Sequence, residues 1–255
     1  MKSAESASTG GSDYDRHARA ELHRWQARMR RPPNLLDHLT RSVQTRLNRI
    51  IPEKIHQALT ATIKQLVRGV LFGAEHTSTP PLLAPTSLVA REMVVQERIA
   101  HYRNLATAEG AATGAAGFLL GLADFPLLLG LKLKLLFEIA ALYGHDVRQY
   151  PERVYLLLVF QLAFSSQHGR NAVFRQLEDW DATATALPPD VHDFDWRTFQ
   201  QEYRDYIDLA KLAQLLPVIG AAVGAVANYR LVGHLGQTAM MAYRMRAQPK
   251  PGLGT

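Results

Sequence analysis

Apolar residues recur at intervals of three and four along most of the chain. This spacing lines one face of an α-helix, and the strict alternation that marks a half-buried strand is nowhere sustained. We therefore expect an all-α fold, a single helical domain of about eight to ten helices. A first helix carries Leu22, Trp25 and Met29 on one face. A helix over residues 87–108 carries Met93, Ile99 and Tyr102 on another such face.

Residues 110–144 form the most apolar part of the chain. The 22 residues from Gly110 to Leu131 contain one charged side chain, Asp124, and a straight helix of this length would reach about 33 Å, enough to cross a bilayer. Pro126, five glycines and the cost of a carboxylate in lipid, about 2.5–3.5 kcal/mol, argue against a simple span. We predict instead a central Gly-rich apolar helical hairpin, broken at residues 123–126 and ended by Gly144.

Small residues recur in this hairpin and in the last predicted helix, residues 217–246. Glycines four residues apart let two helix backbones approach closely, either in a protein core or in a membrane, and the motif alone does not separate the two. The last helix is the expected packing partner of the hairpin, and its basic end, with Arg244 and Arg246, suits the helix dipole. The helix-packing glycines are Gly110, Gly114, Gly117, Gly121, Gly220 and Gly224.

A few polar side chains interrupt these apolar segments. Asp124 directly precedes Phe125 and Pro126 and is expected to cap the second hairpin helix. A buried polar pair with Asn228 and a catalytic role are the alternatives. His145, directly after the predicted helix end, is expected to be a solvated loop residue.

Chemical motifs indicate no reaction. The chain has no cysteine, which excludes a disulfide, a thiolate metal site and a cysteine nucleophile, and its ten histidines lack metal-ligand spacing. The phosphate-binding loop, the dinucleotide fingerprint and the G-x-S-x-G elbow are also missing. We therefore expect no metal and no cofactor, and an enzyme is disfavoured but stays open.

Positive charge is concentrated near the N-terminus. The formal net charge is +6, and residues 16–49 contain nine arginines against two acidic residues. A solvated basic face and attraction to anionic lipid are both open interpretations, whereas nucleic acid is disfavoured because no reading module accompanies the arginines. The basic surface is assigned to Arg24, Arg28, Arg30, Arg31, Arg41, Arg46 and Arg49.

The two ends of the chain are expected to be loose. Residues 1–15 are polar and rich in Ser, Gly and Ala, without the apolar core of a secretory signal, so we expect a disordered lead-in there. A helical domain is expected over residues 16–247 and a flexible tail over residues 248–255. Within the domain, the acidic residues 181–195 are expected to form a surface loop.

Several segments, in this order, resemble the EcsC protein family. They are Trp25 with the basic segment after it, IIPEKIHQAL at residues 50–59, GAAGFLLGLADFPLLLGLKLKLLFEIAALYGHD at residues 114–146 and LPVIGAAVGAVANYRLVGHLGQTAMMAYRMR at residues 216–246. The resemblance covers nearly the whole chain, except for the polar lead-in and the proline-rich residues 79–85. Positions that fit the family pattern are Asp124, Tyr143, Gly144, Asp146, Pro217, Gly220 and Asn228.

The resemblance implies a bacterial, predominantly helical protein linked to membranes or transport, and it supplies no catalytic residues. We expect a non-enzymatic cytoplasmic protein that associates peripherally with the inner membrane, through an anionic membrane surface or a membrane-protein partner of transport or secretion. The basic region would provide attraction, and the apolar hairpin would insert or dock. The alternatives are an enzyme acting on a lipid or other apolar substrate, and a fully soluble interaction module. The oligomeric state stays open.

Overall fold

The computed structural model describes residues 2–32, 61, 65, 69–70, 87–116, 118–165, 167–193 and 221–248. The regular elements within these residues are all helical, so the predicted all-α class is confirmed. They are α1 (Lys2–Arg30), α4 (Leu88–Ala116), α5 (Phe118–Leu142), α6 (Tyr150–Phe164), α7 (Gln167–Glu178), α8 (Trp180–Thr185), the 3-10 turn η2 (Val191–Asp193) and α11 (Ala221–Arg246).

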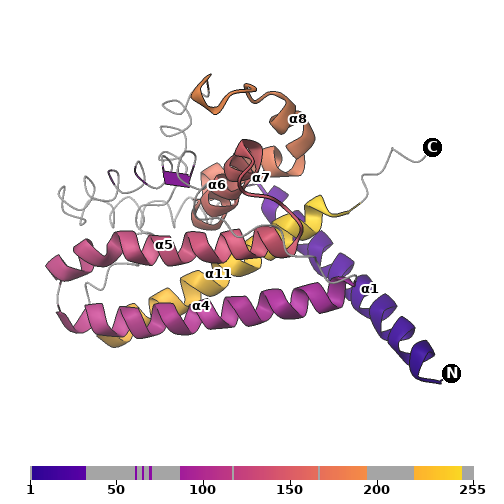
Figure 1. The fold of residues 1–255 in the computed structure, drawn as a ribbon, viewed down its shortest axis with the longest axis horizontal. Helices are drawn as coiled ribbons and strands as arrows, with labels where there is room; N and C mark the ends of the chain where they lie inside the picture. The colour runs from indigo at the N-terminus through magenta and orange to yellow at the C-terminus, as the bar shows by residue number, and fades with distance from the viewer. Residues whose placement is uncertain are drawn as a thin grey trace.

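Three long helices form the frame of the fold. α4 and α5 lie side by side, and α11 packs against both of them (Figure 1). α11 runs antiparallel to α4, since Gly236 lies opposite Ile99 and Gly233 lies opposite Arg103. The C-terminal helix therefore packs on both α4 and α5.

The turn between α4 and α5 lies elsewhere than predicted. α4 continues to Ala116 and α5 runs from Phe118 to Leu142 without interruption, so the predicted break at residues 123–126 is wrong. Proline in a helix interior costs about 3 kcal/mol. The turns after Pro126 offset this cost by burying Leu129, Leu135 and Leu136 in the core. Asp124 lies inside α5, where it does not cap a helix, and its side chain is outside the described residues.

α6 is the most deeply buried helix. Every residue from Glu152 to Phe164 is buried, because a helix that is apolar on all sides has to be surrounded. α7 and α11 pack against it, and α5 contacts it. The short helix α8 lies in the segment predicted to be a loop, and its Trp180 is buried with its ring 4.9 Å from that of Tyr155. Burial of this indole explains why the segment is helical at its start.

α1 crosses the other helices near the ends of α4 and α11 (Figure 1). The predicted apolar face is confirmed for Leu22 and Trp25, which are buried together with Ala18. α1 begins at Lys2, so the lead-in expected to be disordered is helical in the structure. Once the packed part has formed a helix, each further residue adds a hydrogen bond at little cost. The first turns of α1 thereby project beyond the bundle (Figure 1).

The buried face of α4 differs by one residue from the predicted one. Met93, expected on the apolar face, is 62% exposed, and its neighbour Glu92 is fully buried. A carboxylate thus occupies a core position at the start of the helix. The buried residues recur at intervals of three and four: Glu92, Val95, Ile99, Tyr102 and Ala106.

Gly144 ends α5, as predicted. Its φ is +85°, which favours glycine, and its amide donates to the carbonyl of Ala141 at 3.0 Å while the amide of His145 donates to that of Ala140 at 2.9 Å. This pair of bonds is the Schellman motif. The turn sends Tyr143 toward α4 and His145 toward α6, where each contacts a carboxylate.

Close approach between α4 and α11 occurs at Gly233 and Gly236. A Cβ atom at position 236 would lie 2.5 Å from Cγ1 of Ile99, and one at position 233 would lie 3.2 Å from Nε of Arg103. The sequence analysis did not select these two glycines. The glycines predicted from the sequence cannot be placed in the same way. Gly110, Gly114, Gly121 and Gly224 lie in helices, but their surroundings are outside the described residues, and Gly117 and Gly220 are themselves outside the described residues.

Replacement of Gly236 by alanine is expected to destabilise the protein by about 1–3 kcal/mol, because the new methyl group overlaps the stiff side chain of Ile99. Urea unfolding followed by circular dichroism measures the loss. The matched control is Gly130→Ala in α5, where nothing lies within 4 Å of the Cβ position and alanine is expected to add up to about 1 kcal/mol. Destabilisation of both variants alike would contradict the close contact.

Candidate functional site

A buried ion pair joins the last turn of α11 to the first turns of α4. Arg244 and Glu92 are 3% and 0% exposed. Nε of Arg244 donates to Oε1 of Glu92 at 2.7 Å and Nη2 donates to Oε2 at 2.5 Å, the two-pronged geometry in which a guanidinium matches a carboxylate. Nη1 donates to the carbonyl of Ala18 at 3.0 Å and to Oε2 of Glu21 at 2.8 Å, both on α1.

Two tyrosines complete the hydrogen bonds of the Glu92 carboxylate. Tyr143 donates to Oε1 at 2.9 Å and Tyr14 donates to Oε2 at 2.5 Å. Burial, together with the charge and the hydrogen bond of Glu92, raises the pKa of both phenols well above the usual value, so both remain proton donors at neutral pH. Burial alone would lower the pKa of Arg244, but its hydrogen bonds to Glu92 and Glu21 raise it.

These five side chains connect four separate parts of the chain. α1 provides Tyr14 and Glu21, α4 provides Glu92, the end of α5 provides Tyr143 and α11 provides Arg244. We call them the Arg244 cluster. Since every oxygen of the buried carboxylate is hydrogen-bonded, the cluster fixes the place at which α1 crosses α4 and α11.

A second ion pair lies two residues further along α11. Arg246 donates to both oxygens of Glu152, each at 2.6 Å. Its guanidinium also lies 4.8 Å from the ring centroid of Tyr155 and 5.5 Å from that of Trp180, where the ring quadrupoles attract a cation. The last turn of α11 is thus held by α1 and α4 through Arg244 and by α6 and α8 through Arg246.

His145 lies between the two ion pairs and is not the solvated loop residue expected from the sequence. Its side chain is 22% exposed, with Nδ1 3.5 Å from Oε2 of Glu152, and its ring stacks on Tyr243 at 5.2 Å. Burial, with a smaller effect of the Arg246 charge, lowers the pKa of His145 to about 4 although Glu152 acts in the opposite direction. The imidazole is therefore neutral at pH 7.

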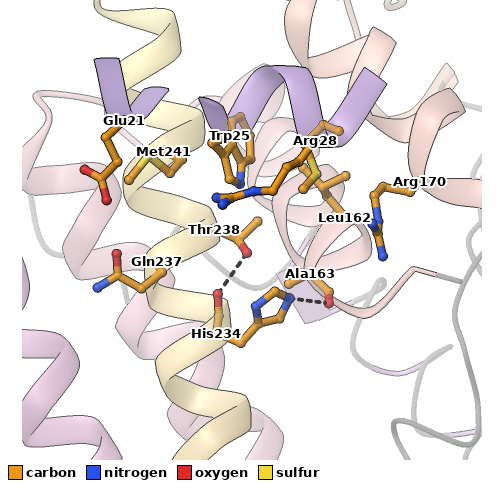
Figure 2. A pocket seen from close by; sticks show the side chains of 11 residues that line it. Glu21, Trp25, Arg28, Leu162, Ala163, Arg170, His234, Gln237, Thr238 and Met241 are labelled. Atoms are coloured by element: carbon orange, nitrogen blue, oxygen red, sulfur yellow. Dashed lines mark hydrogen bonds between the residues drawn. The ribbon is translucent and has the colours of Figure 1, made fainter. Parts of the chain in front are cut away.

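A cleft of about 460 Å³ opens beside the Arg244 cluster, between α1, the α6–α7 junction and α11 (Figure 2). This volume is in the range of small-molecule sites. Apolar side chains from three helices line it, and Trp25 and Met241 are almost completely buried there. Met29 and Leu162 extend the apolar wall. Glu21 belongs both to the lining of this cleft and to the Arg244 cluster.

Two arginines extend into the cleft, Arg28 from α1 and Arg170 from α7 (Figure 2). The ion pairs seen in the described part of the chain do not include Arg28. Glu21 lines the opposite end of the cleft (Figure 2), where its carboxylate shares the charge of Arg244 with Glu92. Positive charge therefore prevails at the Arg28 end.

Two hydrogen-bonding groups of the α11 wall are bonded to backbone. Thr238 donates its hydroxyl to the carbonyl of His234 at 2.8 Å, and Nε2 of His234 lies 3.1 Å from the carbonyl of Ala163 (Figure 2). A carbonyl only accepts, so this contact requires the imidazole proton on Nε2. Both groups hold the cleft wall in place, and the site combines an apolar wall with guanidinium groups in a geometry that suits binding.

The polar positions selected from the sequence do not converge on one site. Tyr143 belongs to the Arg244 cluster. Asp146, in the α5–α6 connection, accepts bonds of 2.8 and 2.7 Å from the guanidinium of Arg148, and this hydrogen bonding lowers the pKa of Asp146. Asn228 is fully buried in α11, and its amide has no hydrogen-bond partner within the described residues. Because the side chain of Asp124 lies outside those residues, the alternative of a pair with Asp124 stays a prediction. None of these polar positions lines the cleft between α1, the α6–α7 junction and α11.

Part of the predicted basic surface lies at the end of α1. Arg24, Arg28, Arg30 and Arg31 are all exposed, and Arg30 forms an ion pair with Glu178 of α7. The remaining members, Arg41, Arg46 and Arg49, lie outside the described residues.

Sequence reasoning missed both buried ion pairs and the cleft. It assigned Arg244 and Arg246 to the helix dipole and did not consider Glu92. The usable signal was periodicity: Glu92 lies three residues before Val95 on the buried face, and a charge in a core position requires a partner of opposite sign. The cleft gave no such signal, because helices far apart in the chain line it.

Two features are absent from the described ranges. None of the helices there is both long enough and apolar enough to cross a membrane. Nor do three or more metal-ligating side chains gather in one place within the same ranges.

Comparison with known proteins places the chain in a sequence context. The EcsC protein family matches residues 16–247. The chain is 42% identical over 226 residues to Protein EcsC of Bacillus subtilis (strain 168), which covers 89% of this chain and 93% of that protein. It is 32% identical over 212 residues to the uncharacterized protein YdbA of the same strain. These residues cover 83% of this chain and 75% of YdbA. No solved structure matches the chain.

Replacement of Arg244 by methionine is expected to lower the free energy of unfolding by about 3–5 kcal/mol, because Glu92 is left buried without its partner. Combining it with Glu92→Leu removes both charges and is expected to recover part of this loss. Tyr14→Phe, the control, deletes one donor and is expected to cost about 1 kcal/mol. Urea unfolding compares the three proteins, and no recovery in the double variant would show that the lone carboxylate is not the cause.

The stability of the protein is expected to fall between pH 6.5 and pH 4 through His145, whose pKa is about 4 in the fold and 6.5 ordinarily. Below pH 6.5 the imidazole of His145 takes up a proton in the unfolded chain but not in the folded protein. The contribution of His145 to the free energy of unfolding is therefore complete above pH 6.5 and is lost as the pH falls. From pH 7 to pH 5 the loss is about 2 kcal/mol.

Urea unfolding at both pH values, with His145→Gln as the comparison, isolates this contribution. The variant is expected to lose about 2 kcal/mol less than the unmodified protein. Equal losses in the two proteins would mean that His145 titrates normally in the fold.

Proposed function

We propose, starting from the fact that the chain belongs to the EcsC protein family, that it is a non-enzymatic protein that binds peripherally to an anionic membrane surface. The observation that carries this proposal is the surplus of positive charge on the exposed side of α1. A membrane protein of transport or secretion is the other partner expected from the sequence, and it enters as an outcome of the test.

The surplus follows from how the charges of α1 are paired. Its acidic residues Asp13 and Glu21 each form an ion pair with an arginine, Arg16 and Arg244. Exposed arginines that belong to no ion pair in the described ranges remain against two further acids of the helix, Glu5 and Asp15. They are Arg19, Arg24 and Arg28 in α1 and Arg31 directly after it.

A rigid support makes these charges effective. The Arg244 cluster holds one part of α1, and further along the helix the ring of Trp25 packs edge-on against that of Phe174 at 5.4 Å. Each arginine near an anionic bilayer contributes about 1 kcal/mol of attraction. Because α1 is already ordered, binding does not have to pay for folding of the helix.

Apolar side chains are exposed at the other end of the bundle, toward the Gly-rich ends of α4 and α11. They include Leu105, Val226 and Tyr229. The guanidinium of Arg103 lies 3.7 Å from the ring centroid of Tyr229, and aromatic and basic side chains together are typical of membrane interfaces. This surface supports the second part of the proposal, in which an apolar contact follows the electrostatic attraction.

The full chain is expected to sediment with vesicles that contain phosphatidylglycerol and to stay in solution with vesicles of phosphatidylcholine alone. The triple variant Arg19→Gln, Arg24→Gln, Arg31→Gln is expected to bind about 100-fold more weakly, from about 1 kcal/mol for each arginine. The matched control replaces the exposed cations Arg98, Lys134 and Arg230 of α4, α5 and α11 by glutamine and is expected to lose much less.

Salt distinguishes the two parts of the proposal. Loss of binding at raised ionic strength implicates the arginines, and binding that persists implicates the apolar surface. Absence of binding to anionic vesicles at low salt, with folded protein, would overturn the membrane proposal. Salt-sensitive binding to native membranes alone would then favour a membrane-protein partner.

A further inference from the structure

The cleft beside α1 has two chemically different parts. Its wall is formed by Trp25 and Met29 of α1, Leu162 of α6 and Met241 of α11. An indole ring and unbranched thioether side chains adapt well to a flexible alkyl chain. The wall is held by backbone hydrogen bonds of His234 and Thr238, so the cleft exists without a ligand.

The charged part determines what such a chain must carry. Arg28 and Arg170 extend into the cleft from two helices (Figure 2), and a planar guanidinium matches carboxylate and phosphate oxygens. Glu21 at the opposite end would repel an anion. Figure 2 shows the guanidinium of Arg28 beside Trp25 and apart from that of Arg170, so a ligand with one anionic end is favoured with its charge at Arg28.

We infer that this cleft binds a single-chain anionic amphiphile, with the anionic group at Arg28 and the alkyl chain along Trp25, Leu162 and Met241. The volume of about 460 Å³ suits a ligand of this kind. Such binding requires no membrane, so it goes beyond the proposed surface binding. A free fatty acid and a lipid with a phosphate headgroup share this chemistry, and the test separates them.

Isothermal titration calorimetry of the full chain with short-chain ligands below their micelle-forming concentrations tests the inference. Octyl phosphate is expected to bind, and hexyl phosphate, which is two methylenes shorter, is expected to bind about 15-fold more weakly, because each buried methylene contributes about a fourfold factor. Inorganic phosphate, which lacks the chain, and octyl glucoside, which lacks the charge, are expected to bind far more weakly. Octanoate distinguishes a fatty-acid carboxylate from a phosphate headgroup.

The variants concern one arginine and its neighbour on the same helix. Arg28→Gln is expected to weaken octyl phosphate binding by at least about tenfold, because it removes a charged hydrogen-bond donor. Arg24→Gln, one turn earlier, removes the same charge from a residue that does not line the cleft and is expected to leave the affinity unchanged. Both positions are exposed, so both variants are expected to fold, which unfolding curves verify.

Three results would overturn the inference: no binding of octyl phosphate, equal affinity for octyl glucoside, or equal losses in Arg28→Gln and Arg24→Gln. Tight binding of octyl phosphate that is lost only in Arg28→Gln supports it. The vesicle experiment uses Arg19, Arg24 and Arg31 and leaves Arg28 in place, so a failure of membrane binding and a failure of the cleft are separate results.

Discussion

The bidentate pair between Arg244 and Glu92 is the interaction on which the arrangement of α1, α4, α5 and α11 depends. Its third guanidinium nitrogen contacts α1, and its carboxylate accepts the hydroxyls of Tyr14 and Tyr143. A buried charge tolerates few geometries, because any that leaves a polar atom unpaired is costly. The cleft depends on it in part, since α1 and α11, two of its walls, are helices that this pair holds in place.

The last turn of α11 organises the centre of the molecule through Tyr243, Arg244 and Arg246. Arg244 and Arg246 reach carboxylates on α4 and α6, and the ring of Tyr243 between them stacks with Tyr143 at 5.7 Å and with His145 at 5.2 Å. Buried ion pairs often stabilise a protein no more than apolar residues of the same shape would. Their contribution here is to specify one arrangement of helices that apolar contacts alone would leave less defined.

The sequence predicted what depends on local pattern. The helical class, the apolar face of α1 and the stop at Gly144 all follow from spacing and from the backbone freedom of one glycine. The break at residues 123–126 was predicted wrongly because the preference of Pro126 was weighed without the packing of α5, which comes from other helices. Partners such as Glu92 and Arg244, 152 residues apart, and a cleft between distant helices depend on the tertiary arrangement, which local pattern does not contain.

The contact between Gly236 and Ile99 has a consequence for how the chain can diverge. It lies between two other cross-links of the same helix pair, Arg244 with Glu92 on one side and Gly233 beside Arg103 on the other. A slide of α11 by one turn would remove the guanidinium from its carboxylate and would bring a larger side chain against Ile99. Substitutions at these positions are therefore coupled: in a relative where position 236 is not glycine, position 99 is expected to be smaller, and loss of the arginine is expected to accompany loss of the glutamate.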